Sequence, residues 1–168
     1  MTAEIRPGVL DDLPALLDVY NHQILTSHST FDLEEMTLEQ RTEWFGHYTP
    51  DGPHRLLVAD VDGRAVGYAT SSMFRAKAAY APSVETSIYL ATDATGQGIG
   101  RILYSELLRQ LEAHPGLHRA YAGVALPNDA SEGLHRALGF TEVGTYTEVG
   151  FKMDRYVDVR WYERDLGV

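Results

Sequence analysis

Short runs rich in β-branched and aromatic residues recur along the chain, and several of them alternate between apolar and polar positions. Such runs, bounded by Gly, Pro or Asp, are typical of strands. The dipeptide Asp62-Gly63 predicts a hairpin turn between two of them. We expect strands at residues 4–6, 55–61, 65–74, 84–91, 119–126, 140–149 and 157–166.

Apolar residues at three- and four-residue spacing predict helices between these strands. Asp11 and Asp12 can cap the first helix, and Thr37 with Gln40 forms a capping box at the start of the second. Gly139 is a suitable C-terminal stop for the last helix. We expect helices at residues 13–23, 37–48, 99 to about 114 and 131–138.

Two of the expected helices carry a clear apolar stripe that would face a core. In the first, the stripe is formed by Leu13, Leu16, Leu17, Tyr20 and Ile24. In the third, it is formed by Ile99, Ile102, Leu103, Leu107, Leu108 and Leu111. The order of elements predicts one mixed α/β domain over residues 1–168, and the hairpin argues against an all-parallel doubly wound sheet.

A glycine-rich turn, Gly96-Gln97-Gly98-Ile99-Gly100, joins the strand at 84–91 to the third helix. The first backbone N–H groups of a helix have no partner, and glycines let an anion approach them. Arg101 adds a positive charge in the same turn. The turn therefore predicts a phosphate site, although the same glycines would also serve an ordinary tight turn.

Two common phosphate motifs do not match this turn. A P-loop would continue from its last glycine with Lys and Ser or Thr, whereas Gly100 is followed by Arg101 and Ile102. The dinucleotide fingerprint needs a third glycine where this chain has Arg101.

Composition narrows the classes of partner. The net charge of −10 argues against nucleic acid and anionic membranes as partners. The chain has no cysteine, which excludes disulfides, thiolate metal sites and a Cys nucleophile. The N-terminal residues contain no apolar signal core, so we expect a cytoplasmic protein, and the histidines lack metal-ligand spacing, so we expect no metal.

Segments from nearly the whole chain together resemble the GNAT superfamily of N-acetyltransferases. The resemblance is closest to phosphinothricin N-acetyltransferases and relatives that acetylate methionine sulfoximine or methionine sulfone. It rests on the glycine turn and on the segments NHQILTS, FRAKAAY, VETSIY, LPNDASEGLHRALGF and VGFKMDRYVDVRWYERDL, which occur in the family's order.

This resemblance implies a mixed, mostly antiparallel sheet that is splayed between two central parallel strands to admit acetyl-CoA. The pyrophosphate would lie on N–H groups of the glycine turn, and the pantetheine arm on the strand backbone. One departure is Thr95, where the family pattern has Arg or Gln, and we expect weaker acetyl-CoA binding from it. The implied acetyl-CoA contacts are Ile88, Tyr89, Leu90, Gly96, Gln97, Gly98, Ile99, Gly100, Arg101, Asn128 and Ser131.

The resemblance also implies catalytic residues. Acetyl transfer to an amine needs a base, and Glu85 is the candidate at the start of the strand that would carry pantetheine. His135 occupies the place of a tyrosine that many relatives carry near the sulfur of CoA. The alternatives are a solvated carboxylate at a strand end for Glu85 and a packing residue for His135.

A small acidic amino acid would need cations and a shaped pocket. The resemblance implies Phe31, Arg75, Lys77, Tyr80 and Lys152 as substrate contacts, while ordinary surface charge is the alternative for the two cations of the loop, Arg75 and Lys77. In relatives the pocket is shared across a dimer interface, so we expect a homodimer.

The resulting hypothesis is an acetyl-CoA-dependent N-acetyltransferase of a small amino acid such as phosphinothricin, methionine sulfoximine or methionine sulfone. One alternative is acetylation of another amine, such as a polyamine, an aminoglycoside or a protein N-terminus. A non-catalytic acyl-CoA-binding module is the alternative from another class, and a structural interaction domain would leave the glycine turn unexplained.

Overall fold

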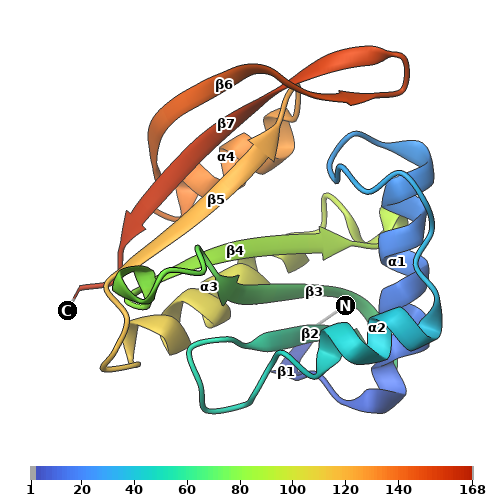
Figure 1. Cartoon of the computed structure of the whole chain (residues 1–168). Helices are drawn as coiled ribbons and strands as arrows, with labels where there is room; N and C mark the ends of the chain where they lie inside the picture. Colours follow the sequence, from blue (N-terminus) through green and yellow to red (C-terminus); the bar gives the residue numbers. More distant parts are fainter. Residues whose placement is uncertain (1–2, 168) are drawn as a thin grey trace.

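A computed structural model describes residues 3–167 as a seven-stranded sheet with helices on both faces (Figure 1). The strand order is β1-β2-β3-β4-β5-β7-β6, and every neighbouring pair except β4–β5 is antiparallel. The strands are β1 (Glu4–Pro7), β2 (Leu56–Val61), β3 (Arg64–Met73), β4 (Ser83–Leu90), β5 (Arg119–Ala125), β6 (Thr141–Lys152) and β7 (Arg155–Asp165). The α-helices are α1 (Leu13–Thr26), α2 (Leu38–Phe45), α3 (Ile99–Glu112) and α4 (Asp129–Ala137).

Alternation along β2 distributes the core over the two faces of the sheet. Leu57 and Ala59 belong to a buried cluster that includes the apolar face of α3. Leu56 and Val58 point the other way, into a second cluster with residues of α1 and with Trp44 of α2. The sheet is therefore a central layer, with α3 on one face and α1 and α2 on the other.

The two parallel central strands pair over a short distance only. Ser83, Val84 and Glu85 lie opposite residues 119–121, and beyond this point β4 continues beside β3 while β5 continues beside β7. Figure 1 shows β4 and β5 diverging toward the end of the molecule where α1 lies. The splayed mixed sheet predicted from the sequence is confirmed, and it leaves one edge of β4 without a strand neighbour from Ser87 to Leu90.

Several predicted boundaries differ from those of the structure. The first helix continues to Thr26, because its last turn is not interrupted by the polar residues that suggested a stop. The second helix ends at Phe45, and Gly46 follows it as the C-terminal cap. The last two strands are longer than predicted and form a hairpin closed at Met153 and Asp154, which both have positive φ.

Two predicted side-chain roles were wrong. The carboxylate of Asp12 does not cap α1: it accepts two hydrogen bonds of 2.8 Å from the guanidinium of Arg6 and one from the backbone N–H of Val9. Ile102 does not belong to the buried face of α3, because it is 52% exposed, whereas Tyr104 is fully buried there. The capping box of Thr37 and Gln40 is confirmed.

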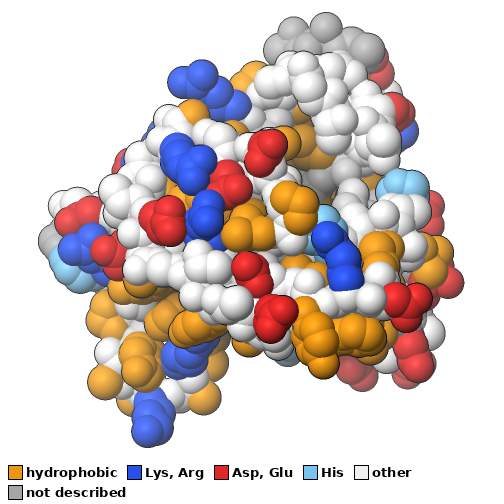
Figure 2. Space-filling model, turned by 90° about the horizontal axis from the view of Figure 1, so that it is seen from above, with side chains coloured by type: hydrophobic (Ala, Val, Ile, Leu, Met, Phe, Trp, Pro, Cys, Tyr) orange, Lys and Arg blue, Asp and Glu red, His pale blue; other side chains and the backbone are white. Residues whose placement is uncertain are grey.

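The surface above β6 and β7 shows hydrophobic side chains exposed between charged ones (Figure 2). The exposed large hydrophobic residues of this hairpin and its turn are Val143, Tyr146, Val149, Phe151, Met153 and Tyr156. Within residues 3–167, none of the helices has both the length and the apolar character that crossing a membrane requires.

We expect Leu103→Ala to lower the free energy of unfolding by about 2–5 kcal/mol, because it removes a fully buried side chain and leaves a cavity. Ile102→Ala, one residue earlier on the same helix, is the matched control and should change stability much less, since Ile102 is half exposed. Urea unfolding of both variants measures the difference. Equal losses would contradict the packing described here for α3.

Candidate active site

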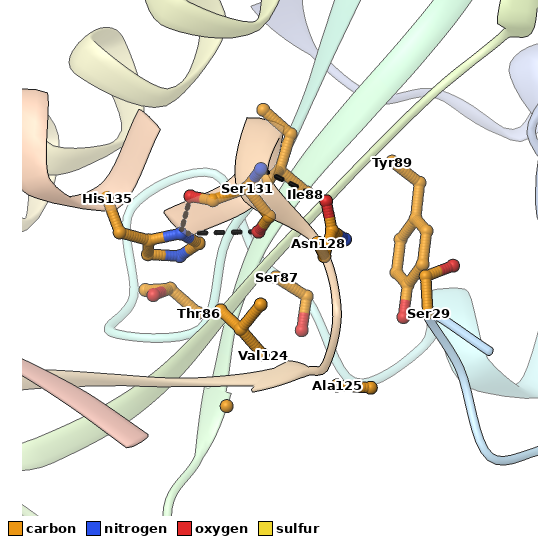
Figure 3. A pocket seen from close by; sticks show the side chains of 11 residues that line it. Ser29, Thr86, Ser87, Ile88, Tyr89, Val124, Ala125, Asn128, Ser131 and His135 are labelled. Atoms are coloured by element: carbon orange, nitrogen blue, oxygen red, sulfur yellow. Dashed lines mark hydrogen bonds between the residues drawn. The ribbon is translucent and has the colours of Figure 1, made fainter. Parts of the chain in front are cut away.

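Three adjoining pockets lie where β4 and β5 diverge, and all three are lined by Ser29 and Tyr89. One runs along the open edge of β4 to the glycine turn, one lies between β4, β5 and α4, and one opens toward Glu85 and β7. The shared residues place the three pockets side by side, and together we call them the channel. Figure 3 shows the middle pocket, with Tyr89 and Ser29 on one side and His135 on the other.

The glycine turn forms one end of this channel. Gly96 and Gly98 have φ values of +72° and +80°, which side-chain-bearing residues rarely adopt, and open space lies where their Cβ atoms would be. A Cβ on Gly100 would lie 3.1 Å from the Leu90 side chain, so this glycine lets α3 pack closely on β4. The turn therefore presents bare backbone at the N-terminus of α3, as an anion site requires.

Not every residue of the turn offers its side chain. The amide of Gln97 donates a 2.6 Å hydrogen bond back to the carbonyl of Asp93, and Ile99 is buried in the core. The hydroxyl of Thr95 donates to the carbonyl of Thr92 at 2.8 Å. Arg101 is exposed and lines the pocket, so it is the cation available in the turn.

Asn128 and Ser131 lie opposite the open edge of β4. The Asn128 side chain caps α4 by accepting a 3.1 Å hydrogen bond from the backbone N–H of Ser131. Both residues line two of the pockets, as does Ile88, while Tyr89 lines all three and Leu90 lines the pocket that reaches the glycine turn. The channel between α4 and β4 thus has backbone and small polar groups on both sides.

Glu85 is half-buried at the point where β4 and β5 part, and it lines the third pocket. Burial raises the pKa of its carboxyl, and the positive charge of Arg75 opposes this shift. Most of the other walls of the pocket are apolar, and they include Phe31, Tyr146, Val149, Val159 and Trp161. A carboxyl in such surroundings is a stronger base than an exposed glutamate.

His135 is 3% exposed on α4, and Phe140 and Tyr162 pack against its ring. Its Nδ1 lies 2.7 Å from the carbonyl oxygen of Ser131, which can only accept, so Nδ1 carries a hydrogen. Burial lowers the pKa of His135, and the hydrogen bond to Ser131 opposes the shift. The neutral ring therefore keeps its lone pair on Nε2, 3.2 Å from the hydroxyl of Tyr104.

Residues 16–140 match the model of the acetyltransferase (GNAT) family. The chain belongs to this family. It is 53% identical to phosphinothricin N-acetyltransferase of Streptomyces coelicolor, over 97% of this chain and 96% of that protein. It is 32% identical to an L-methionine sulfoximine/L-methionine sulfone acetyltransferase of Pseudomonas aeruginosa, over 99% and 96% of the two chains.

A solved GNAT structure agrees with the fold. The phosphinothricin acetyltransferase of Sinorhizobium meliloti, in complex with acetyl-CoA, superposes with a TM-score of 0.94 at 36% identity, over 99% of this chain and 90% of that one. The resemblance stated from the sequence, the splayed mixed sheet and the assignment as an acyltransferase are therefore confirmed.

The predicted substrate contacts are brought together only in part. Phe31 lines the pocket of Glu85, and its ring packs on the backbone of Gly150, where a Cβ would collide with it. The Arg75 guanidinium lies 4.3 Å from the centre of the Phe74 ring and 5.8 Å from that of Trp161. Arg75 is therefore beside this pocket without lining it.

The other three predicted contacts lie outside the linings of these pockets. Lys77 and Tyr80 are exposed in the loop before β4, where Tyr80 packs edge-on against Phe74. Lys152 is buried and donates a 2.8 Å hydrogen bond to the carbonyl of Thr30. Its ammonium thus fixes the segment before Phe31, so within this chain its contact with the pocket is indirect.

Two residues of the site were missed by sequence reasoning. Ser29 lines all three pockets, but it lies in a polar segment without periodicity, and no local signal marks it. Trp161 lies in the last expected strand, where nothing in the sequence marks it as part of a site. It lines the pocket of Glu85, and its indole nitrogen is buried without a hydrogen-bond partner among the described residues.

Proposed function

We propose that this GNAT enzyme transfers an acetyl group from acetyl-CoA to the α-amine of a small amino acid, such as phosphinothricin, methionine sulfoximine or methionine sulfone. The observation that carries the proposal is the row of adjoining pockets that extends from the glycine turn to Glu85. The names of the relatives support the same class of substrate.

The residues present fit acetyl-CoA. The bare backbone of the turn and Arg101 suit a pyrophosphate, and the unpaired edge of β4 from Ser87 to Leu90 suits the amide groups of a pantetheine arm. Acetyl-CoA supplies the activated thioester. With Thr95 turned back to Thr92, we infer that phosphate binding depends on backbone N–H groups and Arg101.

Glu85 acts as the general base in this proposal. The amine is mostly protonated at neutral pH and must lose a proton before it can attack the thioester carbonyl. The raised pKa of Glu85, its half-buried position and the apolar walls of its pocket support this role. No cysteine is present, so direct transfer is favoured over a covalent acetyl-enzyme.

We assign His135 to the second proton transfer. It lines the middle pocket, between the glycine turn and Glu85, and its neutral ring carries its lone pair on Nε2, 3.2 Å from the hydroxyl of Tyr104. The buried packing of this ring also matches a purely structural role, and the experiment described in the next subsection separates the two.

The walls of the Glu85 pocket favour a small, mostly apolar side chain with a polar end. Phe31, Val149, Val159 and Trp161 supply apolar surface, Ser29 and Thr30 supply polar groups, and Arg75 supplies positive charge beside the pocket. This combination fits a methionine-like amino acid with an oxidised or anionic end better than a polyamine, for which cationic surroundings would be unfavourable.

We also propose a homodimer in which the β6–β7 hairpin contacts a second copy. Tyr146 and Val149 of this hairpin are more than half exposed and also line the Glu85 pocket, so a partner covering them would narrow the pocket. A sedimentation experiment on the chain and on Phe151→Ser tests this. A wild-type monomer at micromolar concentration would contradict the proposal.

Release of free thiol from acetyl-CoA across a panel of amines tests the proposed function. The panel holds phosphinothricin, methionine sulfoximine, methionine sulfone, methionine, spermidine and an aminoglycoside. We expect turnover with the amino acids only. Turnover with the cationic amines alone would mean that the substrate pocket is misassigned, and binding of acetyl-CoA without any turnover would favour the non-catalytic module.

A further inference from the structure

A buried chain of hydrogen bonds connects β4, α3 and α4 behind the active site. The Thr86 hydroxyl lies 2.6 Å from that of Tyr104, which lies 3.2 Å from Nε2 of His135. At one end, the Thr86 hydroxyl lies 3.2 Å from the carbonyl oxygen of Tyr121, and at the other, Nδ1 of His135 lies 2.7 Å from that of Ser131. All three side chains are at most 3% exposed.

This chain of hydrogen bonds has fewer donor hydrogens than donor–acceptor contacts, here called links, when His135 is neutral. Both ends are carbonyl oxygens, which only accept, and the Ser131 hydroxyl, 3.4 Å from Nδ1, can accept from the same N–H, so the four links need four hydrogens. A neutral imidazole, a phenol and a hydroxyl supply one hydrogen each, and therefore one link stays empty. An imidazolium supplies two, and all links are then filled.

Two arrangements fill the 2.6 Å link between the hydroxyls of Thr86 and Tyr104 and leave the empty link elsewhere. If Thr86 donates to Tyr121, then Tyr104 donates to Thr86 and Nε2 of His135 has no donor. If Tyr104 donates to Nε2, then Thr86 donates to Tyr104 and the link to Tyr121 is empty. In the first arrangement the added proton on Nε2 fills the empty link directly, and in the second the hydrogens of Tyr104 and Thr86 also turn, toward Thr86 and Tyr121.

We propose that Tyr104 and Thr86 are positioning residues that make His135 a proton acceptor, because protonation of its ring completes this chain. The proposal rests on the proposed function of the site. His135 and Thr86 line the middle pocket, whereas Tyr104 is entirely enclosed, so a proton would enter at His135.

The protons of the reaction balance in this scheme. Glu85 takes the first proton from the ammonium group and gives it to solvent after the product has left. When the nitrogen attacks, the N–C bond forms, and the nitrogen loses a second proton, which His135 holds. When the C–S bond breaks, the sulfur leaves as a thiolate and takes that proton, which restores the neutral chain.

Other groups around His135 do not supply this proton. Glu132 lies about one helical turn before His135 in α4. It keeps its negative charge because hydrogen bonds from Tyr162 and Arg160 hold the pKa of its carboxyl below the usual range. The titratable and charged groups that pack around His135 and Tyr104 come from α3, α4 and β7, and they are Tyr104, Glu132, Arg136, Arg160, Tyr162 and Arg164.

Thr86→Val and Thr86→Ser, both made in the full-length protein, form the matched test. Val removes the hydroxyl and leaves the shape, so protonation of His135 no longer adds a hydrogen bond, whereas Ser keeps the hydroxyl. NMR of ¹⁵N-histidine-labelled protein follows the imidazole, with His135→Gln identifying the signal. We expect His135 to become protonated at lower pH in Thr86→Val and at the wild-type pH in Thr86→Ser.

Activity gives the second readout, with methionine sulfone as substrate. We expect Thr86→Val to lower kcat about tenfold, the equivalent of one buried hydrogen bond, with the KM for acetyl-CoA unchanged and the acid limb of the pH profile displaced. Thr86→Ser should have the kcat and the acid limb of the wild type. Tyr104→Phe should match Thr86→Val, and it gives an independent test if one variant folds poorly.

Equal titration of His135 in the Val and Ser variants would overturn the proposal, as would a wild-type His135 that stays neutral down to the pH of unfolding. The NMR measurement needs no turnover. If the enzyme acetylates none of the amino acids, the proposed function fails. The NMR titrations still decide whether the hydrogen-bond chain sets the pH at which His135 becomes protonated.

Discussion

Glu85→Gln is expected to lower kcat about 100- to 10,000-fold, the usual contribution of a general base. The amide has nearly the shape of the carboxyl but cannot take a proton from the ammonium group of the substrate. Glu85 is half-buried and lines a pocket with mostly apolar walls, so the loss should not be compensated by solvent. Thiol release from acetyl-CoA under substrate saturation measures the effect.

Binding of acetyl-CoA should survive this substitution, because the glycine turn and the open edge of β4 do not contain Glu85. Glu163→Gln is a suitable control: Glu163 is also a half-buried strand carboxylate, but it lines none of the three pockets. If Glu85→Gln retained wild-type kcat, Glu85 would be removed from the mechanism.

The pH dependence of the wild type gives a second check on Glu85. A base acts in its ionised form, so the rate should fall as the pH drops through the pKa of the carboxyl in the enzyme. Because burial raises this pKa, the fall should occur above the ordinary range of a glutamate. In the profile of Glu85→Gln, only the fall caused by protonation of His135 should remain at acid pH.

Gly98→Ala is expected to raise the KM for acetyl-CoA about ten- to 100-fold. Gly98 has φ +80° and is the N-cap of α3, and its missing Cβ leaves open space in the pocket. A methyl group there would stand between the phosphate and the first N–H groups of the helix. Loss of one charge-assisted hydrogen bond, about 1.5–3 kcal/mol, corresponds to this range.

Gly63→Ala is the matched control for this experiment. Gly63 has φ +82° and equally open space around its missing Cβ, but it lies in the β2–β3 turn, outside the three pockets. Both variants carry the cost of a left-handed residue, about 1–2 kcal/mol, so their losses of stability should be similar. An unchanged KM in Gly98→Ala would argue against an anion site at this turn.

The elements of the sheet could be predicted because they depend on local patterns. Alternation in β2 follows from the pleat of a strand, and the glycines of the turn fix a backbone shape that few other residues adopt. The predicted ends of helices and their buried faces were less accurate where contacts with distant residues determine them. Thr26 extends α1 through a polar segment, and Ile102 follows the helical spacing but faces outward.

The sequence by itself determined the family, the order of the elements and the glycine turn, since each can be recognised from short segments of neighbouring residues and their order along the chain. Only the tertiary structure decided which distant residues meet: Ser29 and Trp161 reach the pocket of Glu85 from opposite ends of the chain. It also decided the state of the titratable groups. Burial raises the pKa of Glu85 and lowers that of His135, because desolvation depends on all the elements packed around a charge and leaves no pattern in the sequence.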